Sequence, residues 1–175
     1  MAKVITFSRT FPAYHPKAGE PTYFVEKVIK SLPKFEADSL FLGNLAGYFD
    51  FLKLEEFTPK YHTIRAGSRW KEGDRFSPRI WSGKPYTSKQ ITIAPDTEIK
   101  KVWDVVFIDS ADSNITGYDY GFWCMVDDVI ISDFSLNELA KNDGLSVIDL
   151  VSWFNIKPNK TFKGQIICWN ENISY

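Results

Sequence analysis

The stretch KYHTIRAGSRWKEGD, residues 60–74, combines a strand pattern with a turn. Residues 61–65 are β-prone, and this strand pattern stops at the Ala-Gly pair at 66–67. The segment Lys-Glu-Gly-Asp at 71–74 has the composition of a turn, and residues 75–81 again have strand character. This strand–turn–strand pattern predicts that β-structure dominates the middle of the chain.

The residues before this stretch predict one short strand and one helix. Residues 4–7, Val-Ile-Thr-Phe, favour a strand. Over residues 22–31 the apolar side chains recur at three- and four-residue spacing, and Thr22 is the expected helix cap. The apolar segment 33–58 follows, and we expect it to be an insertion with helical character.

The residues after this stretch predict more strands and two short helices. The helices are expected at 135–144 and 147–154, where Ser135 and Ser146 have the position and chemistry of caps. The strands are expected at 90–93, 100–108, 122–131 and 164–169. These elements predict an α+β fold, a small mixed β-barrel flanked by short helices, in one domain over residues 1–175.

Composition narrows the class of protein. The 175 residues are 44% hydrophobic and 25% charged, with a net charge of −1, which is typical of a folded domain that buries a core. We find no apolar run near the length of about 20 residues that a membrane span needs, and no signal-peptide pattern at the start. We therefore expect a cytoplasmic protein without membrane contact. Cys124 and Cys168 have no metal-binding spacing, and we expect both to be reduced core residues.

Charge is distributed unevenly along the chain. Residues 60–89 contain eight basic and two acidic residues, a net charge of +6, whereas residues 102–150 contain ten acidic residues and one basic residue, a net charge of −9. Aromatic residues alternate with the basic ones in the first segment. Arginine and lysine bind phosphate, and aromatic rings stack on unpaired bases, so this mixture favours single-stranded nucleic acid or a nucleotide. The alternative is that the tryptophans belong to the core and the charges lie on solvated strand faces.

Under the binding hypothesis, seven residues of this cationic segment form the site. The phosphate ligands and stacking rings are expected to be Arg65, Arg69, Arg79, Lys84, Lys89, Trp70 and Trp81.

Common catalytic and metal motifs are missing from the sequence. It contains no P-loop, no GxGxxG, no HExxH and no GxSxG, and only two histidines. We therefore expect no cofactor and no metal site. His62 is interpreted as a hydrogen-bonded structural residue, and the pair Asp127-Asp128 as a turn or strand end rather than a metal site.

The motifs of residues 60–74 resemble those of the ASCH domain family, which belongs to the PUA-like superfamily. Its Lys-x-x-Thr-Ile-Arg strand matches residues 60–65, and its Trp-Lys-x-Gly-Asp turn matches residues 70–74. The later segment AKNDGLSVIDLVSWF, residues 140–154, and the closing strand GQIICW, residues 164–169, are also similar to the family. The resemblance covers most of the chain except 33–58, and it implies a PUA-like β-barrel that binds RNA or modified nucleosides.

One bacterial branch of this family consists of N(4)-acetylcytidine amidohydrolases, which use a lysine, a threonine and a glutamate. The resemblance assigns these roles to Lys60, Thr63 and Asp143, with aspartate in place of the longer glutamate. On a straight strand Lys60 and Thr63 point to opposite faces, so a shared site requires a bend near Tyr61. Lys60 can act as a base only if burial or the neighbouring cations lower its pKa.

Three hypotheses follow from the sequence. The first is a PUA-like domain that binds RNA or a modified nucleoside, and the second is an amidohydrolase acting on acylated cytidine. The third is a non-catalytic protein-interaction module that uses the aromatic segment 35–57 to form a homodimer or to bind another protein.

Overall fold

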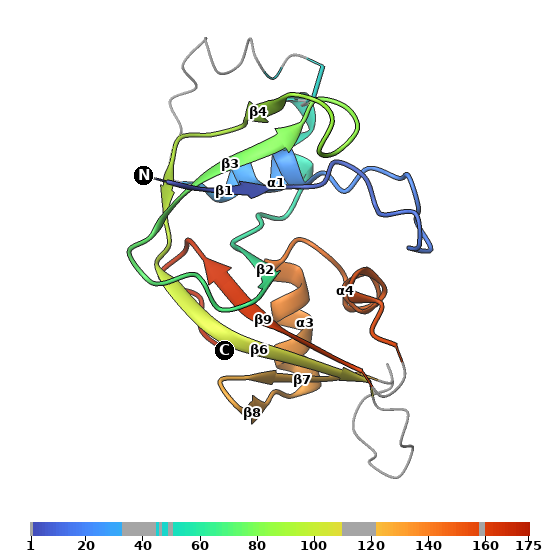
Figure 1. Ribbon diagram of the computed structural model, residues 1–175, viewed down its shortest axis with the longest axis vertical. Coiled ribbons are helices and arrows are strands. Elements are labelled where there is room, and N and C mark those ends of the chain that lie inside the picture. Colours follow the sequence, from blue (N-terminus) through green and yellow to red (C-terminus); the bar gives the residue numbers. More distant parts are fainter. Residues whose placement is uncertain (1, 33–44, 46, 49–50, 110–121, 158–159) are drawn as a thin grey trace.

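The computed structural model describes residues 2–32, 45, 47–48, 51–109, 122–157 and 160–175. It contains two β-sheets together with α-helices, which confirms the α+β class (Figure 1). In the described residues the two sheets do not close into a barrel, so the prediction of a barrel is confirmed only as far as a mixed α+β arrangement.

The first sheet contains four strands and is mixed. Its members are β1 (Lys3–Thr6), β3 (Arg75–Trp81), β4 (Gln90–Thr92) and β5 (Thr97–Glu98). Strand β1 pairs in parallel with β3, whereas β4 and β5 both pair antiparallel with it. The strands predicted at 4–7, 75–81 and 90–93 are thereby confirmed, and no boundary differs from the prediction by more than one residue.

The second sheet contains five antiparallel strands. They lie in the order β2 (His62–Ala66), β9 (Thr161–Cys168), β6 (Lys101–Asp109), β7 (Phe122–Val126) and β8 (Val129–Ile130). Strand β2, which comes from the motif at 60–74, is the edge of this sheet. It lies beside the four-stranded sheet in the centre of the molecule (Figure 1).

The single strand predicted at 122–131 is wrong. The chain reverses at Asp127 and Asp128, whose φ angles are 47° and 65°, and this turn separates β7 from β8. A two-residue hairpin turn of type I′ has positive φ at both central positions, and aspartate adopts this conformation more readily than most residues. The interpretation of this pair as a turn is confirmed.

The local sequence predicts the N-cap residue correctly for only one of the three helices α1, α3 and α4. Helix α4 (Val147–Phe154) begins at Ser146, whose hydroxyl accepts a hydrogen bond from the Asp149 amide as predicted. Helix α3 (Asp133–Asn142) begins at Ser132 and not at Ser135, because the Ser132 hydroxyl accepts from the Ser135 amide.

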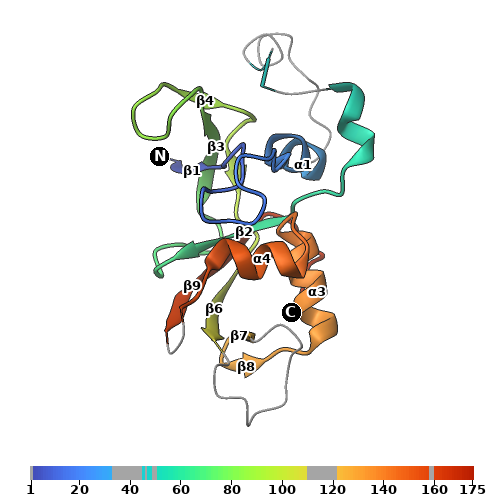
Figure 2. The ribbon, with the colours of Figure 1, turned by 90° about the vertical axis from the view of Figure 1, so that its right-hand side faces the viewer.

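Helix α1 (Phe24–Ser31) has Tyr23 as its N-cap, with a left-handed backbone, so the prediction that Thr22 occupies the cap position is wrong. The Thr22 hydroxyl still accepts from the Phe24 amide at 3.3 Å. Within the insertion predicted at 33–58, residues 33–44, 46 and 49–50 lie outside the described residues. The described part includes the 3-10 helix η1 (Phe51–Glu56), which lies beside α1 (Figure 2).

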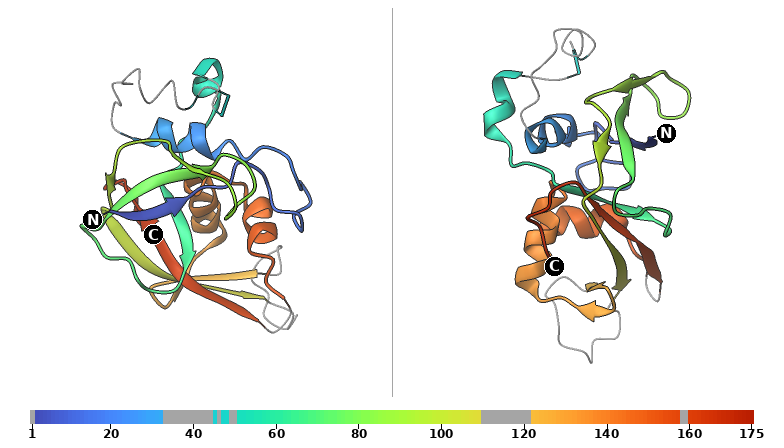
Figure 3. Two further views of the ribbon diagram at one scale, coloured as in Figure 1. Left: turned by 45° about the horizontal axis from the view of Figure 1, so that its top comes forward. Right: turned by 90° about the vertical axis from the view of Figure 1, so that its left-hand side faces the viewer.

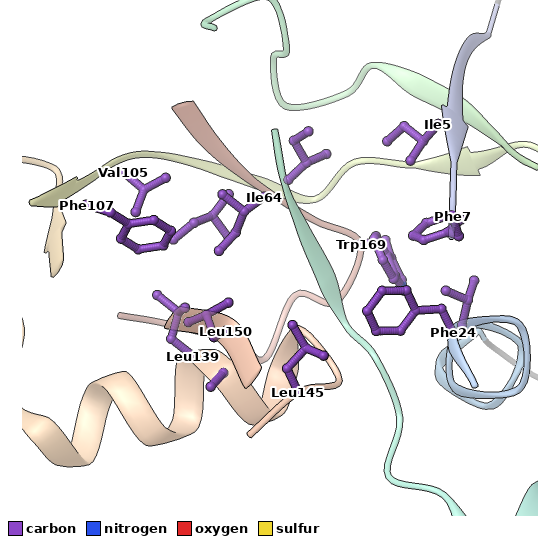
Figure 4. Close-up of a cluster of buried hydrophobic side chains, with 14 of the residues drawn as sticks. Ile5, Phe7, Phe24, Ile64, Val105, Phe107, Leu139, Leu145, Leu150 and Trp169 are labelled. Carbon is purple, nitrogen blue, oxygen red and sulfur yellow. The ribbon is translucent and has the colours of Figure 1, made fainter. Parts of the chain in front are cut away.

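One cluster of buried apolar side chains joins the two sheets. Helices α3 and α4 cover one face of the five-stranded sheet, and α1 packs beside the four-stranded sheet (Figures 2 and 3). Figure 4 shows Phe107 facing Leu139 and Leu150, while Phe7 and Phe24 surround Trp169. Both cysteines are free and buried, as the sequence predicts.

Candidate functional site

The segment before β2 carries Lys60 between two helices. The Lys60 amide donates a hydrogen bond to the carbonyl of Lys27 in α1 at 2.9 Å, and the Tyr61 amide donates to Asn142 at the end of α3 at 2.8 Å. These two main-chain bonds hold the segment against both helices. They bring the Lys60 side chain to Asp143, which lies 83 positions later in the chain.

The end of α3 holds Asp143 in place. Asp143 is the C-cap residue, and its amide donates to the carbonyl of Leu139 at 3.0 Å. The next residue, Gly144, has a φ of 77°, and a Cβ added there would lie 3.4 Å from Lys60 Cβ. Glycine at this position therefore permits both the left-handed turn and the close approach of Lys60.

Lys60 and Asp143 form a buried ion pair. Lys60 Nζ donates to Asp143 Oδ1 at 2.8 Å and also to the Asp143 carbonyl, and Lys60 is only 1% exposed. Burial lowers the pKa of Lys60 to about 8, assisted by the positive charges of Arg65 and Lys27 and opposed by Asp143. The lowered pKa is the condition that a lysine base requires.

The carboxyl group of Asp143 stays ionised. Burial by itself raises the pKa of this carboxyl, but the opposing interactions, led by the positive charge of Lys60, outweigh burial and hold the pKa below its usual value. His62 Nδ1 lies 3.4 Å from the same Oδ1 atom, and the ring is fully buried. Burial also lowers the pKa of His62, so its ring is neutral near pH 7.

His62 was interpreted as a hydrogen-bonded structural residue, and its contacts match that interpretation only in part. Among the described residues, neither of its ring nitrogens has a partner in good hydrogen-bond geometry. The ring instead packs edge-on against Tyr175, with centroids 5.6 Å apart.

Thr63 lies on the same cavity as the ion pair. Strand β2 begins at His62, so Lys60 lies before the strand and does not follow its alternation. Thr63 is buried within the strand and pairs with Ile167 of β9. The three residues expected to be catalytic, Lys60, Thr63 and Asp143, thus line one cavity.

This cavity has a volume of about 280 Å³ and combines a polar inner end with aromatic walls. Its inner end is formed by the three buried residues just named, and its exposed end by Pro85 and Tyr86 in the β3–β4 loop. The remaining lining comes from the β1 end, from α1, β2, β3 and α4: Thr6, Phe7, Ser8, Phe24, Ile64, Arg65, Trp81, Trp153 and Phe154.

Of the seven residues expected to bind nucleic acid, Arg65 and Trp81 line the cavity. Arg65 Nη2 donates to the carbonyl of Thr6 at 2.7 Å, which joins β2 to the end of β1. Its Nε atom is buried and has no hydrogen-bond partner in the part of the chain that the structure describes. The Trp81 ring lies 5.5 Å from the Tyr86 ring, centroid to centroid.

The other five residues lie away from the cavity lining. Trp70 is buried in the core and 3% exposed, with Lys3 and Arg69 against its ring, so it presents no face to a base. Arg79 hydrogen-bonds the side chains of its neighbours in the four-stranded sheet. Lys84 and Lys89 are exposed on the loop between β3 and β4.

Tyr86, Phe24 and Trp153 are lining residues that the sequence did not assign to a site. Tyr86 carried a signal, because it lies in the basic and aromatic segment 60–89. Phe24 and Trp153 carried none, since an aromatic residue in an amphipathic helix usually belongs to the core.

The described residues contain no group of three or more His, Cys, Asp and Glu side chains arranged to hold a metal ion. No helix in the same part of the chain is long and apolar enough to cross a membrane.

Comparisons of the chain with protein-family models, with curated proteins and with solved structures found no match. The functional argument therefore rests on the motifs and on the geometry of the cavity. In that geometry a buried lysine, a threonine and an aspartate meet at the inner end of an aromatic pocket.

Proposed function

We propose that the cavity binds one nucleoside, either free and modified or as a single base of RNA. The observation that carries this proposal is the combination of aromatic walls with a polar inner end in a volume of about 280 Å³. This volume lies just below the range of about 300–1,000 Å³ that is typical of small-molecule sites. It suits one base and its sugar.

The polar groups of the cavity fit the edge of a base. Lys60 and Arg65 supply N–H donors, and Arg65 Nε is a buried donor without a partner among the described residues. The Thr63 hydroxyl both donates and accepts, and the Asp143 carboxylate accepts. A base carries ring nitrogens, carbonyl oxygens and amino groups that pair with such a set.

Binding is tested by calorimetric titration with cytidine, N(4)-acetylcytidine, uridine and adenosine. We expect saturable binding of at least one nucleoside, and a loss of affinity of about fivefold or more in Trp81→Ala, which removes a cavity wall. The matched control is Phe134→Ala, because Phe134 is an aromatic residue 76% exposed in α3, outside the cavity lining. If none of the four nucleosides binds, the proposal is wrong.

The second candidate function is the removal of an acyl group from the exocyclic amine of a cytidine. It is favoured by one specific observation, the meeting of Lys60, Thr63 and Asp143 in the cavity, with a Lys60 pKa of about 8. A lysine with this pKa is partly neutral near pH 7.5 and can accept a proton. Lys60 and Thr63 match the family's catalytic set, and Asp143 stands where that set has a glutamate. Membership of the ASCH family and the PUA-like fold are therefore part of this proposal.

The chemistry of this reaction balances with water as the only co-reactant. Neutral Lys60 takes the proton of the Thr63 hydroxyl, and the oxygen attacks the acyl carbon of the amide. Lys60 returns the proton to the leaving amine as the C–N bond breaks, which leaves an acyl ester on Thr63. Water then hydrolyses the ester and releases the acid. Asp143 keeps the lysine in position throughout.

Hydrolysis is tested by incubating the protein with N(4)-acetylcytidine and following the release of cytidine by chromatography. Lys60→Ala and Thr63→Ala serve as controls, with circular dichroism to show that both variants are folded. If the wild type releases cytidine and neither variant does, the result supports the enzymatic function. Intact substrate after prolonged incubation excludes this activity and leaves the binding function.

The third hypothesis, protein interaction through residues 35–57, concerns a segment that lies largely outside the described residues.

A further inference from the structure

We propose that the natural ligand is a single-stranded RNA segment of at least two nucleotides, with one base inside the cavity and its neighbour stacked on Tyr86. This inference rests on the proposed nucleoside site and extends it. The cavity, at about 280 Å³, has room for one base only, so any neighbouring nucleotide lies outside it. Three features of the loop at its exposed end indicate where that neighbour binds.

The first feature is that the loop between β3 and β4 is internally hydrogen-bonded. The Ser82 amide donates to the Lys89 carbonyl at 2.9 Å and closes the loop. Inside it, the Ser88 amide and hydroxyl both donate to the carbonyl of Lys84, at 3.1 and 2.9 Å. The Gly83 amide donates to the Ser88 hydroxyl at 3.0 Å. These bonds preorganise the loop, so that little ordering is needed when a ligand binds.

The second feature is the position of Tyr86 on this loop. Its side chain lines the cavity and is nevertheless 89% exposed, the highest value among the large apolar and aromatic residues described as exposed. The Tyr86 backbone has a φ of 64°, a conformation that an aromatic residue rarely adopts. The ring contacts the Trp81 ring, with centroids 5.5 Å apart, but it leaves most of its surface in solvent and sits on an unfavourable backbone. An unpaired base would cover this ring by stacking.

The third feature is the charge around the loop. Residues 75–95 contain no aspartate or glutamate but include Lys84 and Lys89. Both lysines are exposed, and neither forms an ion pair with any of the described residues. Arg9 adds a further cation through its hydrogen bond to the Ser82 carbonyl at 3.4 Å. The phosphate between two nucleotides, one in the cavity and one on Tyr86, would lie in this positive field.

The experiment compares ligands of one and two nucleotides on the full chain. The probes are cytidine and N(4)-acetylcytidine, and the dinucleotides in which each is joined to adenosine on its 5′ or its 3′ side. Dissociation constants are measured for the wild type, Tyr86→Ala, Tyr86→Phe and the control Phe134→Ala. Alanine keeps the left-handed backbone equally strained and removes only the ring, and phenylalanine keeps the ring.

We expect one dinucleotide to bind more tightly than its nucleoside. Tyr86→Ala should weaken binding of that dinucleotide by about 5- to 150-fold, the range measured for stacked bases, and should weaken binding of the nucleoside, whose cavity Tyr86 also lines, by a clearly smaller factor. Tyr86→Phe and Phe134→Ala should bind like the wild type. Replacing Lys84 and Lys89 with glutamine should reduce the salt dependence of dinucleotide binding only.

The outcomes separate this inference from the function on which it rests. Two results would disprove stacking on Tyr86 and leave the nucleoside site intact. In the first, a nucleoside binds but no dinucleotide binds more tightly. In the second, Tyr86→Ala binds the dinucleotides as tightly as the wild type does. If neither nucleosides nor dinucleotides bind, both proposals are wrong.

Discussion

Lys60 Nζ lies 2.8 Å from Asp143 Oδ1, and both side chains are almost completely buried. The family that the motifs resemble has a glutamate at the position of Asp143, and aspartate is shorter by one methylene. The shorter side chain still reaches the lysine here, because the C-cap of α3 and the turn at Gly144 bring the two backbones together. The substitution is therefore compatible with an intact pair.

The first prediction is that Asp143→Asn destabilises the fold by about 3 kcal/mol, because it leaves the Lys60 ammonium buried without a counter-charge. Urea unfolding at pH 7 measures the change. The control is Asp128→Asn, an exposed turn position with a φ of 65° that asparagine also tolerates, and it should change stability by less than about 0.5 kcal/mol. Adding Lys60→Met to Asp143→Asn should restore much of the lost stability. A double variant that is no more stable than Asp143→Asn would argue against an uncompensated charge as the cause of the destabilisation.

The second prediction concerns the pH dependence of hydrolysis. The base must be neutral, and the pKa of Lys60 is lowered to about 8, so kcat/KM should rise tenfold per pH unit below 8 and level off above it. A lysine with an ordinary pKa would instead give a rise that continues to about pH 10. Initial rates between pH 6 and 9.5 distinguish these cases. A profile that is flat over this range would exclude Lys60 as the base.

The third prediction concerns Thr63 as the nucleophile. Thr63→Val keeps the shape and burial of the side chain but removes the hydroxyl, so turnover should fall by about a thousandfold or more. Thr63→Ser keeps the hydroxyl and should retain measurable turnover. Single-turnover kinetics on acetylated cytidine measure both variants, with cytidine binding as the check on the cavity. Equal activity of the valine and serine variants would refute the assignment.

The fourth prediction tests the pairing of β2 with β9, which holds Thr63 in the cavity wall. A Cβ added at Gly164 would lie 2.2 Å from the Arg65 carbonyl and 2.8 Å from the Phe162 ring, so Gly164→Ala should cost about 2 kcal/mol or more. Gly83→Ala is the matched control, because its nearest contact would be an ordinary 3.5 Å. Thermal unfolding compares the two. Equal melting temperatures would show that β2 and β9 accommodate the added methyl group without a loss of stability.

Local patterns predicted much of the secondary structure. The strand at 62–66 and the helix at 147–154 follow from β-propensity, a cap and apolar spacing, all of which act between near neighbours. A single strand is predicted across Asp127 and Asp128, although the pair itself is interpreted as a turn or strand end, because apolar residues continue on both sides of it. The sequence predicts Ser135 as the cap, three residues after the cap that the structure shows at Ser132, because a serine at either position has the chemistry of a cap. Such choices depend on tertiary packing, which a local pattern does not contain.

For the candidate site, too, the sequence predicted some features and the tertiary structure decided the others. The sequence by itself determined which residue types are present, and its resemblance to the ASCH family singled out Lys60, Thr63 and Asp143. Only the tertiary structure decided that they share a cavity, that Trp70 is buried in the core and that Tyr86 stands at the cavity mouth. The physical reason is that burial, and the pKa of Lys60 that burial lowers, arise from contacts between elements far apart in the chain.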